Sequence, residues 1–226
     1  MPNYLTVRGE HGVVQIGTDF FNLQLVQKGS VYIPASAPDM QFVSVTVTAV
    51  SPVMCIRPVT KPVALIKVVR NGSQFTYTFG SWQVSGQVAE NIPWYVFDRA
   101  PVNAEKGALM IRNPANNELV FNSNFPVMKI AGIADLPSGN LTAQSAVLDT
   151  GIAGAYAACI SQGRIEHTSQ SKGLGQGFNG QLWAEGVMVN ATGVVTSAVL
   201  RQRDGSGIKY ASPPGGQLML VDVAGL

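Results

Sequence analysis

The chain has 226 residues, of which 46% are hydrophobic and 12% are charged, and its formal net charge is +2. The ample apolar content excludes an intrinsically disordered chain, and the scattered Lys and Arg residues form no basic stripe, so we expect no nucleic-acid partner. No apolar run approaches the ~20 residues of a membrane-spanning helix, so no membrane span is predicted.

A three-strand pattern near the N-terminus returns in the middle of the chain. Residues 5–25 read as a strand, a polar turn, a second strand, a short polar break that ends at Phe20, and a third strand. Residues 109–130 repeat this order, and their polar break ends at Phe125. Because an internal repeat sets the unit of a fold, the sequence predicts two related β-meanders, each opening a β-domain.

Alternating apolar and polar residues predict further strands in the first half of the chain. The predicted strands cover residues 42–48, 53–59, 64–70, 74–79 and 94–97. Asn71-Gly72, between two of these segments, is the strongest short signal for a β-hairpin. Residues 98–107, which include Pro101, are the best candidate for a linker.

The second half continues in the same way, and no segment shows a convincing helical period. Strands are predicted over residues 145–148, 154–161, 181–189, 194–202 and 218–221. Short strands separated by turn signals favour β-sandwiches. We therefore predict an all-β fold of two β-sandwich-like units, residues 1–100 and 101–226. A single sandwich built from both halves is the structural alternative.

The sequence offers no recognisable catalytic residue, cofactor site or metal site. Cys55 and Cys159 lie in hydrophobic strand-like runs, where buried free thiols are the norm. A disulfide between them is the alternative, which a cytosolic origin disfavours. The two histidines, His11 and His167, lack an orienting partner, and no cluster has the spacing of zinc ligands. The N-terminus lacks the features of a signal peptide, so we expect synthesis in a cytoplasm.

Residues 173–180 form a glycine-rich segment that superficially resembles a phosphate-binding loop. Such a loop lies between a strand and the N-terminus of a helix, whereas here the polar segment is followed by a predicted strand. We therefore expect a flexible loop spanning about residues 162–180.

Trp82 and Trp94 are the candidate ligand- or partner-contact residues, because they flank a loop rich in Gly, Ser and Gln. Aromatic side chains beside polar turns are the usual platform for sugar recognition, and they are equally common in hydrophobic cores. Core packing is the favoured interpretation of both residues.

Two stretches, residues 12–29 and residues 94–98 followed by 107–123, resemble small tail proteins of tailed bacteriophages and prophages. A pattern G-L-x-V-x-(N/D) followed by L-V-F-(D/N)-S recurs in that family, and this chain departs from it mildly by having Ala108 before Leu109. The resemblance implies a virion structural protein of the tail, the tail tip or a tail fibre, assembled in the cytoplasm of a bacterial host. It implies docking to other tail proteins and a role in host attachment, through a host surface glycan as one partner. The family brings no catalytic residue to this chain.

Two other classes of function stay open beside a tail protein. A carbohydrate-binding β-sandwich module would use loop aromatics such as Trp82 against a sugar ring. A hydrolase with an unrecognised site is the third hypothesis, and no enzyme activity is predicted.

Two predicted strands, residues 42–48 and 74–79, carry no charged side chain. Exposed sheet edges without charge invite pairing with other chains. We therefore expect a homo-oligomer or stable docking to a tail protein, and the tail resemblance implies a trimer.

Overall fold

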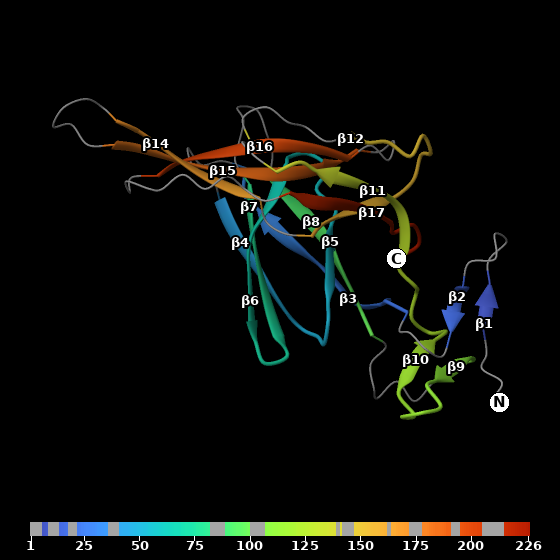
Figure 1. Cartoon of the computed structure of the whole chain (residues 1–226). Helices are drawn as coiled ribbons and strands as arrows, with labels where there is room; N and C mark the ends of the chain where they lie inside the picture. The colour runs from blue at the N-terminus through green and yellow to red at the C-terminus, as the bar shows by residue number, and fades with distance from the viewer. Residues whose placement is uncertain are drawn as a thin grey trace.

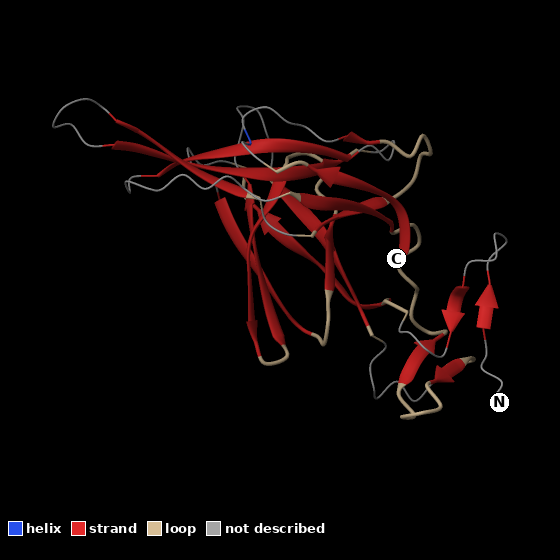
Figure 2. Ribbon diagram, in the orientation of Figure 1, coloured by secondary structure: helices blue, strands red, loops and turns tan. Residues whose placement is uncertain are grey.

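The fold is seen in a computed structural model, which describes residues 6–8, 14–17, 22–35, 41–81, 89–99, 107–138, 141, 147–161, 164–171, 178–190, 195–204 and 215–226. Strands joined by turns and loops make up this part of the chain (Figure 2). No helix within it is long and apolar enough to cross a membrane. The predicted all-β fold is confirmed.

One antiparallel sheet has six strands, and their order across the sheet does not follow the chain. The order is β11 (Lys129–Leu136), β17 (Gly216–Asp222), β13 (Tyr156–Ile160), β5 (Val53–Ile56), β8 (Glu90–Asp98) and β3 (Gln24–Ile33). The two edges of this sheet, β11 and β3, are the third strands of the two repeated meanders.

A second antiparallel sheet packs against the first (Figure 1). Its order is β12 (Val147–Leu148), β16 (Val195–Asp204), β15 (Phe178–Val189), β6 (Val63–Asn71), β7 (Gln74–Ser81) and β4 (Gln41–Thr48), and β14 (Ile165–Ser171) also pairs with β15. The predicted hairpin at Asn71-Gly72 is confirmed, since it joins β6 to β7. Gly72 has a φ of 61°, a left-handed conformation that glycine adopts without steric cost.

Two short hairpins lie beside the sandwich (Figure 1). They pair β1 (Thr6–Arg8) with β2 (Val14–Gly17) and β9 (Met110–Arg112) with β10 (Leu119–Asn122). Each hairpin leads into a long edge strand of the six-stranded sheet, β3 or β11. The predicted repeat of strand, strand and third strand is therefore present in both places.

The two repeats meet where each one enters its long strand. The Met128 N–H donates to the Leu23 carbonyl oxygen at 2.8 Å, and the Leu25 N–H donates to the Pro126 carbonyl oxygen at 2.8 Å. These bonds join the start of the chain to its middle, outside the main ladders of either sheet.

Strands from both sides of residue 100 share both large sheets. In the six-stranded sheet β13 pairs with β5, and in the seven-stranded sheet β15 pairs with β6. The expected division into residues 1–100 and 101–226 therefore does not separate two sandwiches, and we correct it. The described residues adopt the alternative arrangement, a single sandwich to which both halves contribute strands.

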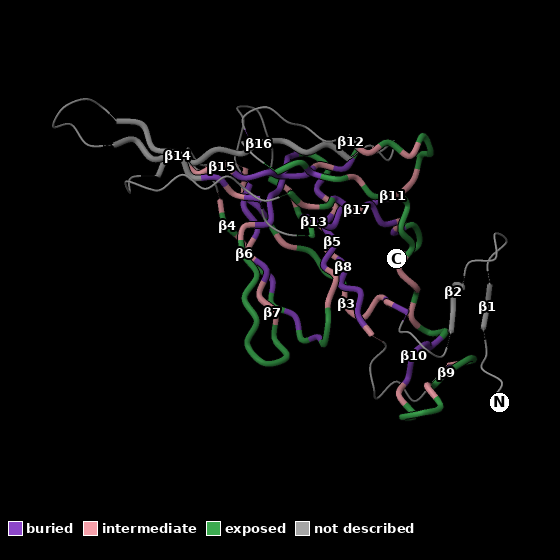
Figure 3. Tube along the Cα trace, in the orientation of Figure 1, coloured by how far each residue is buried: buried purple, intermediate pink, exposed green. Residues whose placement is uncertain are grey.

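The six-stranded sheet is apolar on both faces. Along β8, Ile92 and Val96 belong to the main core between the sheets, whereas Tyr95 and Phe97 belong to a second cluster on the opposite face. The central strands β13 and β5 are mostly buried, whereas the edge strands β3 and β11 carry many exposed or half-buried residues (Figure 3). The second cluster is completed by partly buried residues from outside the central strands, namely Leu23, Leu25, Met128, Ala155 and Leu226.

The expected loop over residues 162–180 is corrected in part. Residues 165–171 form β14, which pairs with β15 from Ile165–Ala184 to Ser171–Phe178. Polar residues dominate β14, so it lacks the apolar alternation by which the other strands are recognised. Residues 173–177 of the glycine-rich segment lie outside the described residues, and its last three residues begin β15.

Candidate functional site

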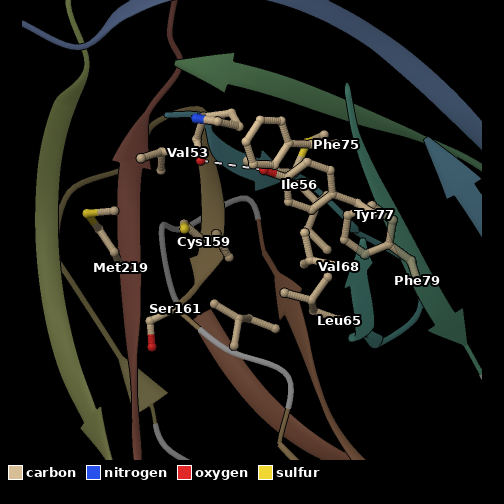
Figure 4. Close-up of a pocket in the computed structure, with 14 residues that line it drawn as sticks. Val53, Ile56, Leu65, Val68, Phe75, Tyr77, Phe79, Cys159, Ser161 and Met219 are labelled. Carbon is tan, nitrogen blue, oxygen red and sulfur yellow. Dashed lines mark hydrogen bonds between the residues drawn. The ribbon is translucent and has the colours of Figure 1, made fainter. Parts of the chain in front are cut away.

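A cavity of about 470 Å³ lies between the two sheets, beside strands β5 and β13 (Figure 4). Its size is within the range of small-molecule sites, roughly 300–1,000 Å³. The walls come from β5, β6, β7, β13 and β17, and they include Met54, Ile56, Leu65, Val68, Phe75, Tyr77, Phe79, Cys159, Ile160 and Met219. Most of these side chains are apolar, so the cavity favours apolar groups.

The cavity extends into the seam between β5 and β13. These strands come from different halves of the chain, and their ladder contains the single pair Ala158–Ile56. The lining includes residues that face the core, such as Met54, and residues of the opposite face, such as Cys159. The lining therefore combines residues whose side chains lie on both faces of the six-stranded sheet.

Tyr77 brings a polar group to the cavity wall. Its hydroxyl donates a long hydrogen bond of 3.5 Å to the Pro52 carbonyl oxygen. Burial raises the pKa of Tyr77 to about 12, and the negative charges of Cys159, Asp98 and Cys55 add to this effect. The phenol is therefore neutral across the physiological range.

Asp98 shapes the turn that leads into β5. Its carboxylate accepts hydrogen bonds from the N–H groups of Val50 at 2.6 Å and Ser51 at 3.0 Å, and from Arg99 N–H at 2.7 Å. A buried carboxylate with several backbone donors is a structural cap. Asp98 thus holds the turn before Pro52, a residue that lines the cavity.

Cys55 and Cys159 are buried free thiols, as predicted. The two thiols share a hydrogen bond, which together with burial holds the pKa of Cys55 well above its usual value. The same hydrogen bond lowers the pKa of Cys159, against the opposing effect of burial. Cys159 is the member of the pair that lines the cavity.

Of the two predicted contact residues, the structure describes Trp94. Trp94 is partly buried and packs against the main core, and its ring lies over Gly29 of the neighbouring strand. This position agrees with the core-packing interpretation of Trp94. Trp82 lies outside the described residues.

The described part of the chain contains no group of three or more His, Cys, Asp or Glu side chains that could hold a metal ion. His11 lies outside it, and His167 is placed only as a backbone position of β14. The prediction that the histidines are not catalytic therefore stays a prediction.

Strand β4 is an edge of the seven-stranded sheet, and its eight residues carry no charge. Its outward-facing hydroxyls pair with the next strand, Ser44 with Thr78 at 3.0 Å and Thr46 with Thr76 at 2.9 Å. Phe42 on the same face is 46% exposed. The other uncharged segment, residues 74–79, lies in β7, which is paired on both sides and is not an edge.

The edge strand β11 exposes apolar side chains that sequence reasoning missed. Ile130 and Ile133 are each 54% exposed. They stand opposite Val221 and Met219 of β17, on the outer face of the six-stranded sheet. A shift of register between Ile130 and Gly132 puts both isoleucines on one face, which simple alternation would not predict.

Comparison with known proteins finds no matching family model, curated protein or solved structure.

Proposed function

We propose that this chain is a structural protein of a bacteriophage tail or tail tip, which assembles with its own copies and with neighbouring tail proteins. The assignment to a tail rests on the resemblance of residues 12–29, and of residues 94–98 followed by 107–123, to small tail proteins. Assembly through sheet edges rests on one observation, the uncharged edge strand β4.

An edge strand presents unpaired backbone N–H and C=O groups to its surroundings. Monomeric proteins commonly protect such edges with Lys, Pro or a bulge. Strand β4 has none of these over Gln41–Thr48, and its ladder with β7 is regular along its whole length. A strand of another chain that pairs with β4 would satisfy its free backbone groups.

A trimer, which the tail resemblance implies, places a condition on this contact. Two identical edges that pair with each other close a dimer, so a ring of three requires contact between two different surfaces. The exposed isoleucines of β11, Ile130 and Ile133, provide a second and apolar surface. We propose that β4 of one copy meets the β11 edge of the next.

The protein composition of purified virions tests the tail assignment directly. Particles produced by the strain that encodes this chain should contain it in a fixed ratio to the major tail proteins, measured by mass spectrometry. An epitope tag should be located on the tail by immunogold electron microscopy. Absence of the chain from purified particles would contradict the proposal.

Light scattering tests the contact surfaces separately. The purified chain should have a multiple of its 23.9 kDa mass. The double variant Ser44→Lys/Thr46→Lys and the variant Ile133→Lys should each give the monomer mass, because charge on an edge opposes pairing. The matched control Thr76→Lys/Thr78→Lys, on the same face but one strand further in, should keep the wild-type mass.

The carbohydrate-binding alternative receives less support from the described residues. Trp94 packs against the core, which leaves Trp82 as the aromatic candidate. A glycan array that shows binding, with loss of binding in Trp82→Ala, would favour this alternative over the tail protein.

A further inference from the structure

The two cysteines of the chain face each other across the seam between β5 and β13. Ile56 pairs with Ala158 in this antiparallel ladder, so one step along the strands brings Cys55 opposite Cys159. Their side chains lie on the same face of the sheet, in one buried cluster. Directly opposed residues in an antiparallel pair have Cα atoms about 4.5–5.5 Å apart. Disulfides span Cα distances of about 4.4–6.8 Å, so the backbone spacing suits a bond between them.

The two sulfur atoms differ in their access to solvent. Cys55 is 0% exposed, whereas Cys159 is 9% exposed and lines the cavity. Cys55 stands between Cys159 and Tyr95 of β8, and Met219 of β17 stands on the other side of Cys159. Cys159 is therefore the thiol that a small reagent can reach first, with Cys55 directly beside it.

We propose that Cys55 and Cys159 form a thiol–disulfide exchange pair, which closes into a cross-strand disulfide when the chain meets a small organic disulfide. The Cys159 thiolate attacks one sulfur of the reagent RSSR, an S–S bond breaks, and one thiolate RS⁻ leaves and takes up a proton. The Cys55 sulfur then loses its proton, attacks the Cys159 sulfur of the mixed disulfide, and expels the second RS⁻. The chain loses two protons and two electrons, and the reagent takes them up and is reduced to two molecules of RSH.

The bond would join two strands whose own ladder contains the single pair Ala158–Ile56. Strand β5 comes from the first half of the chain and β13 from the second. The disulfide therefore acts as a covalent link across the seam, where backbone pairing is sparse. This inference is independent of the proposed role in a phage tail.

The test is to incubate the purified chain with hydroxyethyl disulfide, a reagent small enough for the cavity, at pH 8. Counting thiols after denaturation should show the two cysteines of the wild-type chain fall to none. Intact mass should fall by two hydrogen atoms, and digestion should give a peptide that joins Cys55 to Cys159. The melting temperature should rise by about 5–15 °C, as expected for a disulfide that closes a long loop. Dithiothreitol should reverse each of these changes.

The single variants separate the roles of the two sulfurs. Cys55→Ser should stop at the mixed disulfide, with a mass gain of one reagent thiol on Cys159. Cys159→Ser should stay unmodified over the same period, because the remaining thiol is fully buried. Cys55→Ala and Cys159→Ala serve as second variants if either serine disturbs folding.

Three results would overturn the proposal. The first is a wild-type chain that keeps both thiols under these conditions. The second is a disulfide that forms only between separate chains. The third is equal modification of both single variants, which would mean that the cavity does not set the order of reaction.

Discussion

The indole ring of Trp94 occupies the space in which a side chain at Gly29 would lie. A Cβ atom added to Gly29 would stand 2.5 Å from the ring atom Cζ2. The two residues pair directly across β3 and β8, and Trp94 packs against the main core. An aromatic ring that covers a glycine of the neighbouring strand fills the gap that the glycine leaves at a sheet edge.

We expect Gly29→Ala to destabilise the protein, because the methyl group can be accommodated only if the ring moves. Overpacking of this kind costs about 1–3 kcal/mol of unfolding free energy. Urea denaturation followed by fluorescence measures the change. Ser30→Ala, at the next and exposed position of β3, is the matched control and should change stability by less than about 0.5 kcal/mol. Equal stability of the two variants would show that Trp94 does not constrain position 29.

Gln24 links the two repeated meanders through its buried side chain. Its Nε2 donates to the carbonyl oxygens of Asn122 at 2.6 Å and Phe125 at 2.7 Å, and its Oε1 accepts from Asn122 N–H at 3.0 Å. Gln24→Leu removes these partners, and each unsatisfied buried group costs about 1–3 kcal/mol. We expect a total loss of roughly 2–4 kcal/mol, and faster hydrogen exchange at the Asn122 amide. Gln27→Leu is the control, because Gln27 makes a single exposed bond of 3.3 Å to Thr48.

Arg164 and Glu185 form an ion pair whose side chains are each 2% exposed. Arg164 also donates to the Pro137 carbonyl oxygen. Breaking a buried pair by removing one partner costs about 3–5 kcal/mol, because the other charge stays buried. We expect Arg164→Leu and Glu185→Leu to lose stability by this amount. The double variant should lose clearly less than the sum of the two, and an additive result in the double-mutant cycle would contradict the coupling.

Tyr77 should make the stability of the protein fall at alkaline pH. Its pKa in the folded chain is about 12, above the ~10 of an unfolded chain. Between these values the unfolded chain releases a proton that the folded chain keeps, so the stabilisation is complete below pH ~10 and is lost as the pH rises through about 12. The loss is at most about 2–3 kcal/mol. Tyr77→Phe should flatten this part of the stability curve, and an unchanged slope would assign the effect to other groups.

Separate fragments test how the two halves depend on each other. Residues 1–100 and 101–226 should each fail to fold alone, because each lacks strands of both sheets. Coexpression of the two fragments should restore a complex with β-sheet circular dichroism. A cooperative melting transition of either fragment alone would support two independent units.

Much of the local structure follows from the sequence, because each strand carries its own alternating pattern. Residues 42–48 and the hairpin at Asn71-Gly72 are examples, since their alternation and turn chemistry need no distant partner. Strand β14 was missed because its polar sequence, from Ile165 to Ser171, gives no apolar period.

The order of the strands within each sheet could not be predicted from these alternating patterns. Alternation shows which side chains share a face of a strand, but it does not show which strand lies beside it. The pairing of Val63 with Val187 and of Ala64 with Gly186 joins the two halves, and nothing near either segment specifies the other. The cavity and the facing cysteines depend on this order, so they too could be found only in the folded chain. The position of Trp94 is different, because core packing was the favoured interpretation of this residue from the sequence, and it alternates with Ile92 and Val96 along β8.

The position of β17 has a consequence for synthesis of the protein on the ribosome. Strand β17 is late in the sequence, yet it lies inside the six-stranded sheet, between β11 and β13. Its residues Leu218, Leu220 and Val221 are 0% exposed. Until residues 216–222 leave the exit tunnel, β11 and β13 lack their shared partner and their apolar faces stay uncovered. Incomplete folding intermediates of this kind are the ones that chaperones bind and proteases remove. We therefore expect translation products that stop before β17 to stay incompletely folded.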